Sequence, residues 1–178
     1  MMKILYLHII ICCMFLYSCM QFKKADTGKL LILPKHIEIF NPYLPKLPDS
    51  SLLSGSKTKI YTLVNASCST CLLQLKEWDD FETNINKQKD VQVIVVCESD
   101  DNFQLIKYLF ESKKMDKIHL PLVLDLDNKF ISFNASLLSS EDDLTVLTDS
   151  NNKILLSGNP IKDKNDKKRF MALMPDKQ

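Results

Sequence analysis

Two hydrophobic periods alternate along the chain from residue 59 onward. The stretch KIYTLVNA, residues 59–66, is mostly apolar and rich in strand-forming residues, which predicts a buried strand. Over residues 68–88 the apolar positions change to helical spacing, which predicts an amphipathic helix with one buried face. The residues on that face are Cys71, Leu72, Leu75, Trp78 and Phe81.

A second strand and helix follow in the same order. VQVIVVCES, residues 91–99, is a continuous apolar run, typical of a strand that is covered on both faces. Residues 101–115 return to the helical period, which predicts a second helix. Its apolar positions are Phe103, Ile106, Leu109 and Phe110.

The last third of the chain predicts a strand and then a hairpin. Residues 120–133, LPLVLDLDNKFISF, predict a strand followed by a turn. Residues 143–158 predict two strands around the turn composition Ser-Asn-Asn-Lys at 150–153. A short helix is predicted near residues 167–174.

Strands that alternate with helices predict an α/β fold. The expected architecture is a central mixed sheet with helices on both faces, built from βαβ crossovers and closed by an antiparallel hairpin. Upstream, residues 30–40 form a short extended candidate interrupted by Pro34. The prolines at 42, 45 and 48 exclude regular helix or central strand from the segment that follows.

The first nineteen residues differ from the rest. MMKILYLHIIICCMFLYSC has one basic residue, an apolar run of 14 residues and then Ser18 and Cys19, the layout of a secretory signal. A helix that spans a bilayer needs about 20 apolar residues, so a permanent transmembrane anchor is disfavoured. LYSC resembles a bacterial lipobox, and the resemblance implies cleavage before Cys19 and its lipidation. We therefore divide the chain into a signal (1–18), a tether (19–29), a folded domain (30–165) and a C-terminal helix or tail (166–178).

This processing changes the cysteine count and the charge. Removing residues 1–18 leaves a balanced number of acidic and basic residues, which gives no reason to expect a nucleic-acid partner. Lys23 and Lys24 in the tether favour an anionic membrane surface. The folded part keeps Cys68, Cys71 and Cys97, and export would place them where disulfides persist.

The sequence NASCSTCLLQL, residues 65–75, carries the clearest chemistry. Cys68 is expected where the first strand ends and the first helix begins, and the open N–H groups of a helix start stabilise a thiolate. Cys71 lies one helical turn further on and can reach back to close a disulfide. The pair alone is compatible with a redox couple, half of a metal site or two buried small residues.

The order of strand, CxxC, helix, strand, helix and hairpin resembles the thioredoxin fold. More closely, residues 30–160 resemble the membrane-tethered TlpA/ResA-type thiol-disulfide oxidoreductases of the bacterial envelope. The resemblance implies that Cys68 attacks a substrate disulfide and that Cys71 resolves the mixed disulfide, without a cofactor. It also implies that the partners are exported proteins with thiols or disulfides and a membrane redox partner. The expected location is the bacterial cell envelope, lipid-anchored through Cys19 and facing the periplasm or exterior.

The sequence departs from this family in three places. Ser67 stands where an aromatic residue usually precedes the first cysteine, and Thr70 stands where proline is common. The family also keeps a cis-proline before its third core strand, and the corresponding residue here is Asp143 or Leu144. If Asp143 occupies that place, its carboxylate near Cys68 would oppose the thiolate.

Three other functions are compatible with parts of the pattern. A zinc site needs about four ligands, yet His36 and His119 are isolated, so a copper or zinc protein is disfavoured. A peroxidase of this fold would need a threonine at the position of Asn65. A binding module that has lost catalysis is the strongest alternative.

Cys97 and Trp78 are expected to be core residues.

Overall fold

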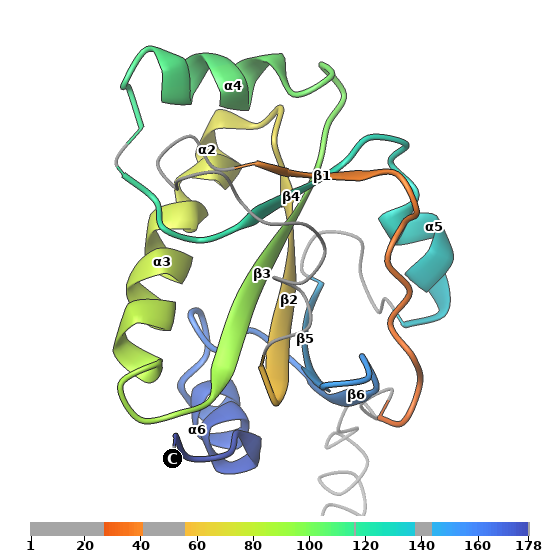
Figure 1. Ribbon diagram of the computed structural model, residues 1–178, viewed down its shortest axis with the longest axis vertical. Coiled ribbons are helices and arrows are strands. Elements are labelled where there is room, and N and C mark those ends of the chain that lie inside the picture. The colour runs from red at the N-terminus through yellow and green to blue at the C-terminus, as the bar shows by residue number, and fades with distance from the viewer. Residues whose placement is uncertain (1–26, 41–55, 116, 138–143, 178) are drawn as a thin grey trace, which may run out of the picture.

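The computed structural model describes residues 27–40, 56–115, 117–137 and 144–177, which form one mixed sheet with helices around it (Figure 1). Within these residues the strand order is β1-β4-β3-β2-β5-β6. Strands β2, β3 and β4 are parallel, and β1, β5 and β6 each run antiparallel to their neighbours. The strands are β1 (Ile37–Phe40), β2 (Thr58–Asn65), β3 (Val91–Glu98), β4 (Leu122–Asp125), β5 (Thr145–Asp149) and β6 (Ile154–Ser157).

The predicted helices are present, and the first one has a break. Leu73 separates α2 from α3, although its backbone stays helical (φ −62°, ψ −27°). The helices are α2 (Ser69–Leu72), α3 (Gln74–Ile85), α4 (Gln104–Glu111), α5 (Phe130–Asn134) and α6 (Lys164–Leu173), with a 3-10 turn η2 (Ala135–Leu137). The predicted order of strands and helices between residues 58 and 111 is therefore confirmed.

Strand β3 is buried on both faces, which explains why its apolar residues do not alternate with polar ones. Val95 and Cys97 face the core cluster formed with α3, α4 and α6, whereas Ile94 and Val96 face the cluster formed with α5. All four side chains are fully buried. Each face of the central sheet is therefore covered by helix, as Figure 1 shows with α3 and α5 on opposite sides, and the predicted α/β fold with helices on both faces is confirmed.

The structure corrects the prediction for residues 120–133, where a strand followed only by a turn was expected. Residues 130–134 form α5, which begins where a carboxylate oxygen of Asp125 accepts the Phe130 N–H at 2.6 Å. The Asn134 amide donates to the Phe130 carbonyl at 2.7 Å and to the Ile32 carbonyl at 2.8 Å. Apolar Phe-Ile-Ser-Phe favours a strand by propensity, but these side-chain hydrogen bonds and the burial of Phe130 stabilise a helix instead.

The C-terminal helix packs against the domain core. Asp163 begins α6, because its carboxylate accepts the backbone N–H groups of Asn165 and Asp166 at 2.6 and 2.9 Å. Phe170 is fully buried in the core cluster on the α3 face, and Met174 lies beside it in the same cluster. This helix is therefore structurally part of the folded domain.

Several predicted features lie outside the described residues. These are the signal and lipidation site at residues 1–19, most of the tether, the proline-rich segment 41–51, and Asp143. Within the described ranges, no helix is long and apolar enough to cross a membrane.

Candidate functional site

Cys68 and Cys71 form a disulfide at the junction between β2 and α2. Their Cα atoms are 5.2 Å apart, within the range that a disulfide requires. Cys68 is the residue that caps the start of α2, with an extended backbone (φ −109°, ψ 108°). The structure therefore brings together the two cysteines that the sequence singled out.

Hydrogen-bond donors surround the sulfur of Cys68. The Cys71 backbone N–H lies 3.2 Å from Cys68 Sγ and donates to it, and the Thr70 hydroxyl oxygen is also at 3.2 Å. A thiolate formed at Cys68 would keep both groups as donors, and hydrogen bonds to the charged form favour it. Thr70, which stands in a place where proline is common in the resembling family, thus adds a donor to the site.

Both cysteines open onto a surface cavity of about 340 Å³. Each cysteine is half-buried, so the sulfurs lie within reach of another molecule while their backbone is held by the domain. Residues from the ends of β2 and β3 and from the start of α3 form the rest of the lining. The full lining is Leu63, Val64, Asn65, Cys68, Cys71, Gln74 and Glu98.

Cys97 is excluded from this chemistry by its burial. It is the free cysteine among the described residues and is fully buried in β3. Burial raises the pKa of its thiol to about 12, so the thiol stays protonated at neutral pH. A protonated, inaccessible thiol is unreactive, and the prediction of a core role for Cys97 is confirmed. Trp78 is likewise fully buried.

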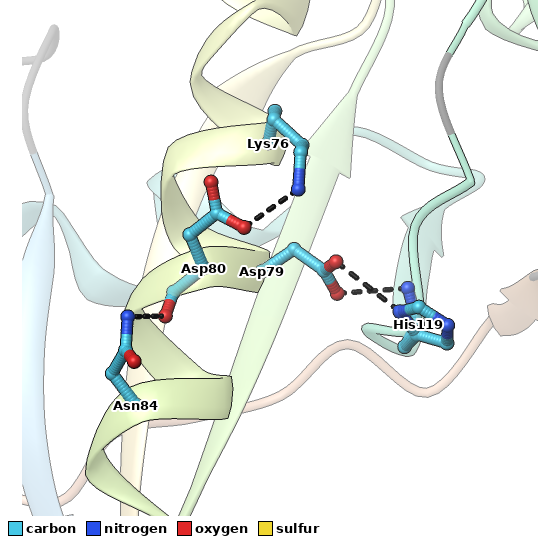
Figure 2. Close-up of polar contacts among 5 residues, drawn as sticks. All are labelled: Lys76, Asp79, Asp80, Asn84 and His119. Atoms are coloured by element: carbon cyan, nitrogen blue, oxygen red, sulfur yellow. Dashed lines mark hydrogen bonds and ion pairs between the residues drawn. The ribbon is translucent and has the colours of Figure 1, made fainter.

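His119 is engaged by α3 rather than by the cysteines. Figure 2 shows Asp79 of α3 pointing to His119, and their contacts are a backbone N–H bond of 2.8 Å and a ring nitrogen contact of 3.3 Å. The other isolated histidine, His36, contacts Asp127 at 2.9 Å on the surface. Among the residues that the structure describes, no three His, Cys, Asp or Glu side chains gather as metal ligands would.

Glu82 of α3 is a buried carboxylic acid with a raised pKa, but it lies away from the disulfide. Burial foremost raises its pKa to about 7, while the Val93 N–H, which it accepts at 2.8 Å, partly offsets that rise. An α-helix advances about 1.5 Å per residue, which places Glu82 about 12 Å along α3 from Gln74, the residue of α3 that lines the cavity at the cysteines. Glu82 therefore joins α3 to β3 and is too far from the cysteines to exchange a proton with them directly.

The resemblance places either Asp143 or Leu144 at the family's cis-proline, and the structure describes Leu144. Its carbonyl accepts the Leu63 N–H at 2.9 Å, which extends the pairing of β5 with β2 beside the end of the strand that leads to Cys68. Its side chain is buried. Every peptide bond in the described ranges is trans.

Similarity to known proteins is found in the structure and not in the sequence. Neither a protein-family model nor a curated protein matches the sequence of the chain. Many solved structures share its fold. Three of them, described next, cover two thirds or more of this chain.

A candidate thiol:disulfide interchange protein DsbE from Chlorobium tepidum has a TM-score of 0.55 at 15% identity, covering 83% of this chain and 96% of that one. A candidate thiol-disulfide oxidoreductase from Bacteroides vulgatus has a TM-score of 0.57 at 12% identity, and the match covers 85% of this chain and 99% of that one. The exposed lipoprotein thioredoxin Etrx1 from Streptococcus pneumoniae has a TM-score of 0.50 at 16% identity, and the match covers 68% of this chain and 87% of that one. The chain therefore has a thioredoxin-like fold, with a CxxC disulfide where its first parallel strand meets the following helix.

Proposed function

We propose that this protein is a membrane-anchored thiol-disulfide oxidoreductase that acts on disulfides of exported proteins through Cys68 and Cys71. The observation that carries the proposal is the Cys68–Cys71 disulfide itself, half-exposed beside a cavity, with donors placed on Cys68 Sγ. Similar folds in proteins described as thiol-disulfide oxidoreductases support the same chemistry.

The exchange reaction needs only the two cysteines. The Cys68 thiolate attacks one sulfur of a substrate disulfide, forming a mixed disulfide and releasing one substrate thiolate. The Cys71 thiolate then attacks Cys68 Sγ, which releases the second substrate thiolate and closes the Cys68–Cys71 disulfide. Two electrons pass to the substrate, which takes up two protons, and a membrane redox partner restores the reduced pair. No cofactor enters these steps.

Thiolate stabilisation assigns the first step to Cys68. Its sulfur accepts the Cys71 N–H, and it lies beside the Thr70 hydroxyl. Cys71 lines the same cavity but also packs against the buried cluster on the α3 face, which suits the resolving role. The arrangement favours Cys68 as the nucleophile and Cys71 as the resolving thiol.

Turnover of a protein disulfide tests the proposed function. With dithiothreitol as the electron source, purified protein should accelerate the reduction of insulin disulfides, and Cys68→Ser should lower the rate to the uncatalysed background. Cys97→Ser is the matched control, because it removes a thiol that is inaccessible. A wild-type rate equal to that of Cys68→Ser would instead favour the non-catalytic binding module.

Membrane anchoring is proposed from the lipobox-like sequence that ends in Cys19. A lipid chain contributes about 0.8 kcal/mol per buried CH₂ group, so a lipidated Cys19 would hold the domain at a membrane of the bacterial envelope. In a bacterial host, Cys19→Ser should move the protein from the membrane fraction to the soluble fraction and abolish incorporation of radiolabelled palmitate. An unmodified protein that takes up no label, together with unchanged membrane association of Cys19→Ser, would contradict lipidation and favour an uncleaved apolar anchor.

A further inference from the structure

Ser67, which directly precedes Cys68, is held by a turn from the neighbouring strand. Its hydroxyl donates to a carboxylate oxygen of Asp101 at 2.9 Å. The same hydroxyl accepts the backbone N–H groups of Asp100 at 2.8 Å and Asp101 at 3.1 Å. One hydroxyl thus links the residue before the nucleophile to the turn that follows β3.

The turn itself is fixed by side-chain hydrogen bonds. Ser99 donates to the same Asp101 oxygen at 2.6 Å and accepts the Phe103 N–H at 2.7 Å. The second Asp101 oxygen accepts the Leu105 N–H at 2.9 Å, in the first turn of α4. These bonds, that from Ser99 foremost, hold the pKa of Asp101 below its usual range, so Asp101 is ionised at neutral pH.

The turn also contains two residues with positive φ. Asn102 and Phe103 both have positive φ, 56° and 62°, a conformation that is rare for a bulky residue such as Phe103. Phe103 is nevertheless buried in the core. Strained residues of this kind persist only where the surroundings fix them, and here the fixing groups include Ser67.

The backbone on either side of Ser67 is also restrained. The Ser67 N–H donates to the Asn65 side chain at 2.8 Å, and the Cys68 N–H donates to the Asn65 carbonyl at 3.3 Å. The hydroxyl bond to Asp101 adds a restraint from a separate part of the sheet. Together they fix the peptide that carries Cys68 and so the direction of its sulfur toward the Cys71 N–H.

We infer that Ser67 is a positioning residue for Cys68, and that the Asp101 carboxylate anchors it while opposing negative charge at the Cys68 sulfur. This inference rests on the proposed function, because it concerns the reactivity of the same thiol. The two residues act in opposite directions: the Ser67 hydroxyl keeps the sulfur on its donor, whereas the charge of Asp101 disfavours a second negative charge nearby. Two further acids, Asp100 in the turn and Glu98 in the cavity lining, lie in the same region.

The alkylation rate of reduced Cys68 at pH 6.5 tests the inference. Iodoacetamide reacts with the thiolate, and peptide mass spectrometry assigns the modified cysteine in the full purified protein. Ser67→Ala should slow the reaction about threefold to tenfold, the effect of one weakened hydrogen bond to the thiolate. Ser67→Thr keeps a hydroxyl and should restore the rate to within about twofold of the unmodified protein.

Asp101→Asn should change the rate in the opposite direction. Its side-chain oxygen can still accept from the Ser67 hydroxyl. The amide nitrogen replaces the oxygen that accepts the Leu105 N–H in α4, and the negative charge is gone. Without that charge, alkylation should accelerate about threefold. Two matched controls should leave the rate unchanged. Ser112→Ala removes a hydroxyl bonded to the Tyr108 carbonyl at the far end of α4, and Asp163→Asn removes the capping carboxylate of α6.

Several results would overturn the inference. One is an alkylation rate of Ser67→Ala within twofold of that of the unmodified protein. Another is that Asp101→Asn slows alkylation as much as Ser67→Ala does. The third is that the control Ser112→Ala slows alkylation as much as Ser67→Ala does. If Ser67→Ala does not fold, Asp101→Asn decides alone, and an unchanged or slower rate refutes the role of Asp101. Alkylation measures the thiol directly, so a protein that fails to turn over insulin but shows these rates would contradict the proposed function and leave the inference intact.

Discussion

Replacing Cys71 with serine should trap substrates on Cys68. Without the resolving thiol, the mixed disulfide formed at Cys68 has no internal thiolate to release it, so its lifetime should increase by about 100-fold or more. The geometry supports this result, because the Cys71 backbone N–H that contacts Cys68 Sγ is kept in the variant. The measurement is non-reducing electrophoresis of extracts of cells that express Cys71→Ser, followed by mass spectrometry of the linked proteins.

Two variants serve as controls for the trapping experiment. Cys68→Ser and the double variant Cys68→Ser/Cys71→Ser should both give no adducts, because each lacks the attacking thiol. Adducts that persist in Cys68→Ser and disappear only in Cys97→Ser would contradict the assignment, since Cys97 is fully buried and its thiol is protonated. Trapped partners that are exported proteins would support the proposed substrate class.

Removing the Phe170 side chain should cost about 3 to 5 kcal/mol of the free energy of unfolding. The residue is fully buried in the cluster that also contains Leu75, Trp78 and Leu156, so truncation to alanine leaves a cavity in the main core. A small domain is stable by about 5 to 15 kcal/mol, so this loss is large. Chemical denaturation of the purified Phe170→Ala variant, monitored by circular dichroism, measures this loss of unfolding free energy.

The same helix supplies a matched control for this stability prediction. Leu173 lies three residues after Phe170 on α6 and is 49% exposed. Leu173→Ala should change the free energy of unfolding by less than about 0.5 kcal/mol. Equal and small effects of the two substitutions would show that α6 behaves as a detached tail instead of part of the domain.

The sequence predicted most of the central fold because its local patterns agree with the tertiary structure. The apolar runs of β2 and β3 are buried on both faces, and the helical period through Leu75, Trp78 and Phe81 coincides with the buried face of α3. The CxxC pair was found for the same reason, because the change of period at residue 68 marks the junction where the disulfide lies.

The features that the sequence did not predict depend on contacts between distant residues. Helix α5 forms from a segment with strand propensity because Asp125 accepts the Phe130 N–H at its start and Asn134 bonds to Ile32, which is 102 residues away in the chain. The Ser67 hydroxyl contacts Asp101 across 34 residues. Neither pairing has a periodic signal, so only the folded chain reveals it. The contact of Asp101 with the Leu105 N–H, in the first turn of α4, likewise becomes visible only in the folded chain.

The redox equilibrium of the Cys68–Cys71 pair in glutathione buffers tests the central claim most directly. Protein equilibrated over a range of reduced to oxidised glutathione ratios is quenched with an alkylating reagent, and mass spectrometry counts the free thiols. We expect one reversible two-electron transition, between about −270 and −120 mV, the range that thioredoxin and DsbA span. The transition should be lost in Cys68→Ser and Cys71→Ser and kept in Cys97→Ser. A pair that forms no reversible disulfide at any ratio would contradict the oxidoreductase function.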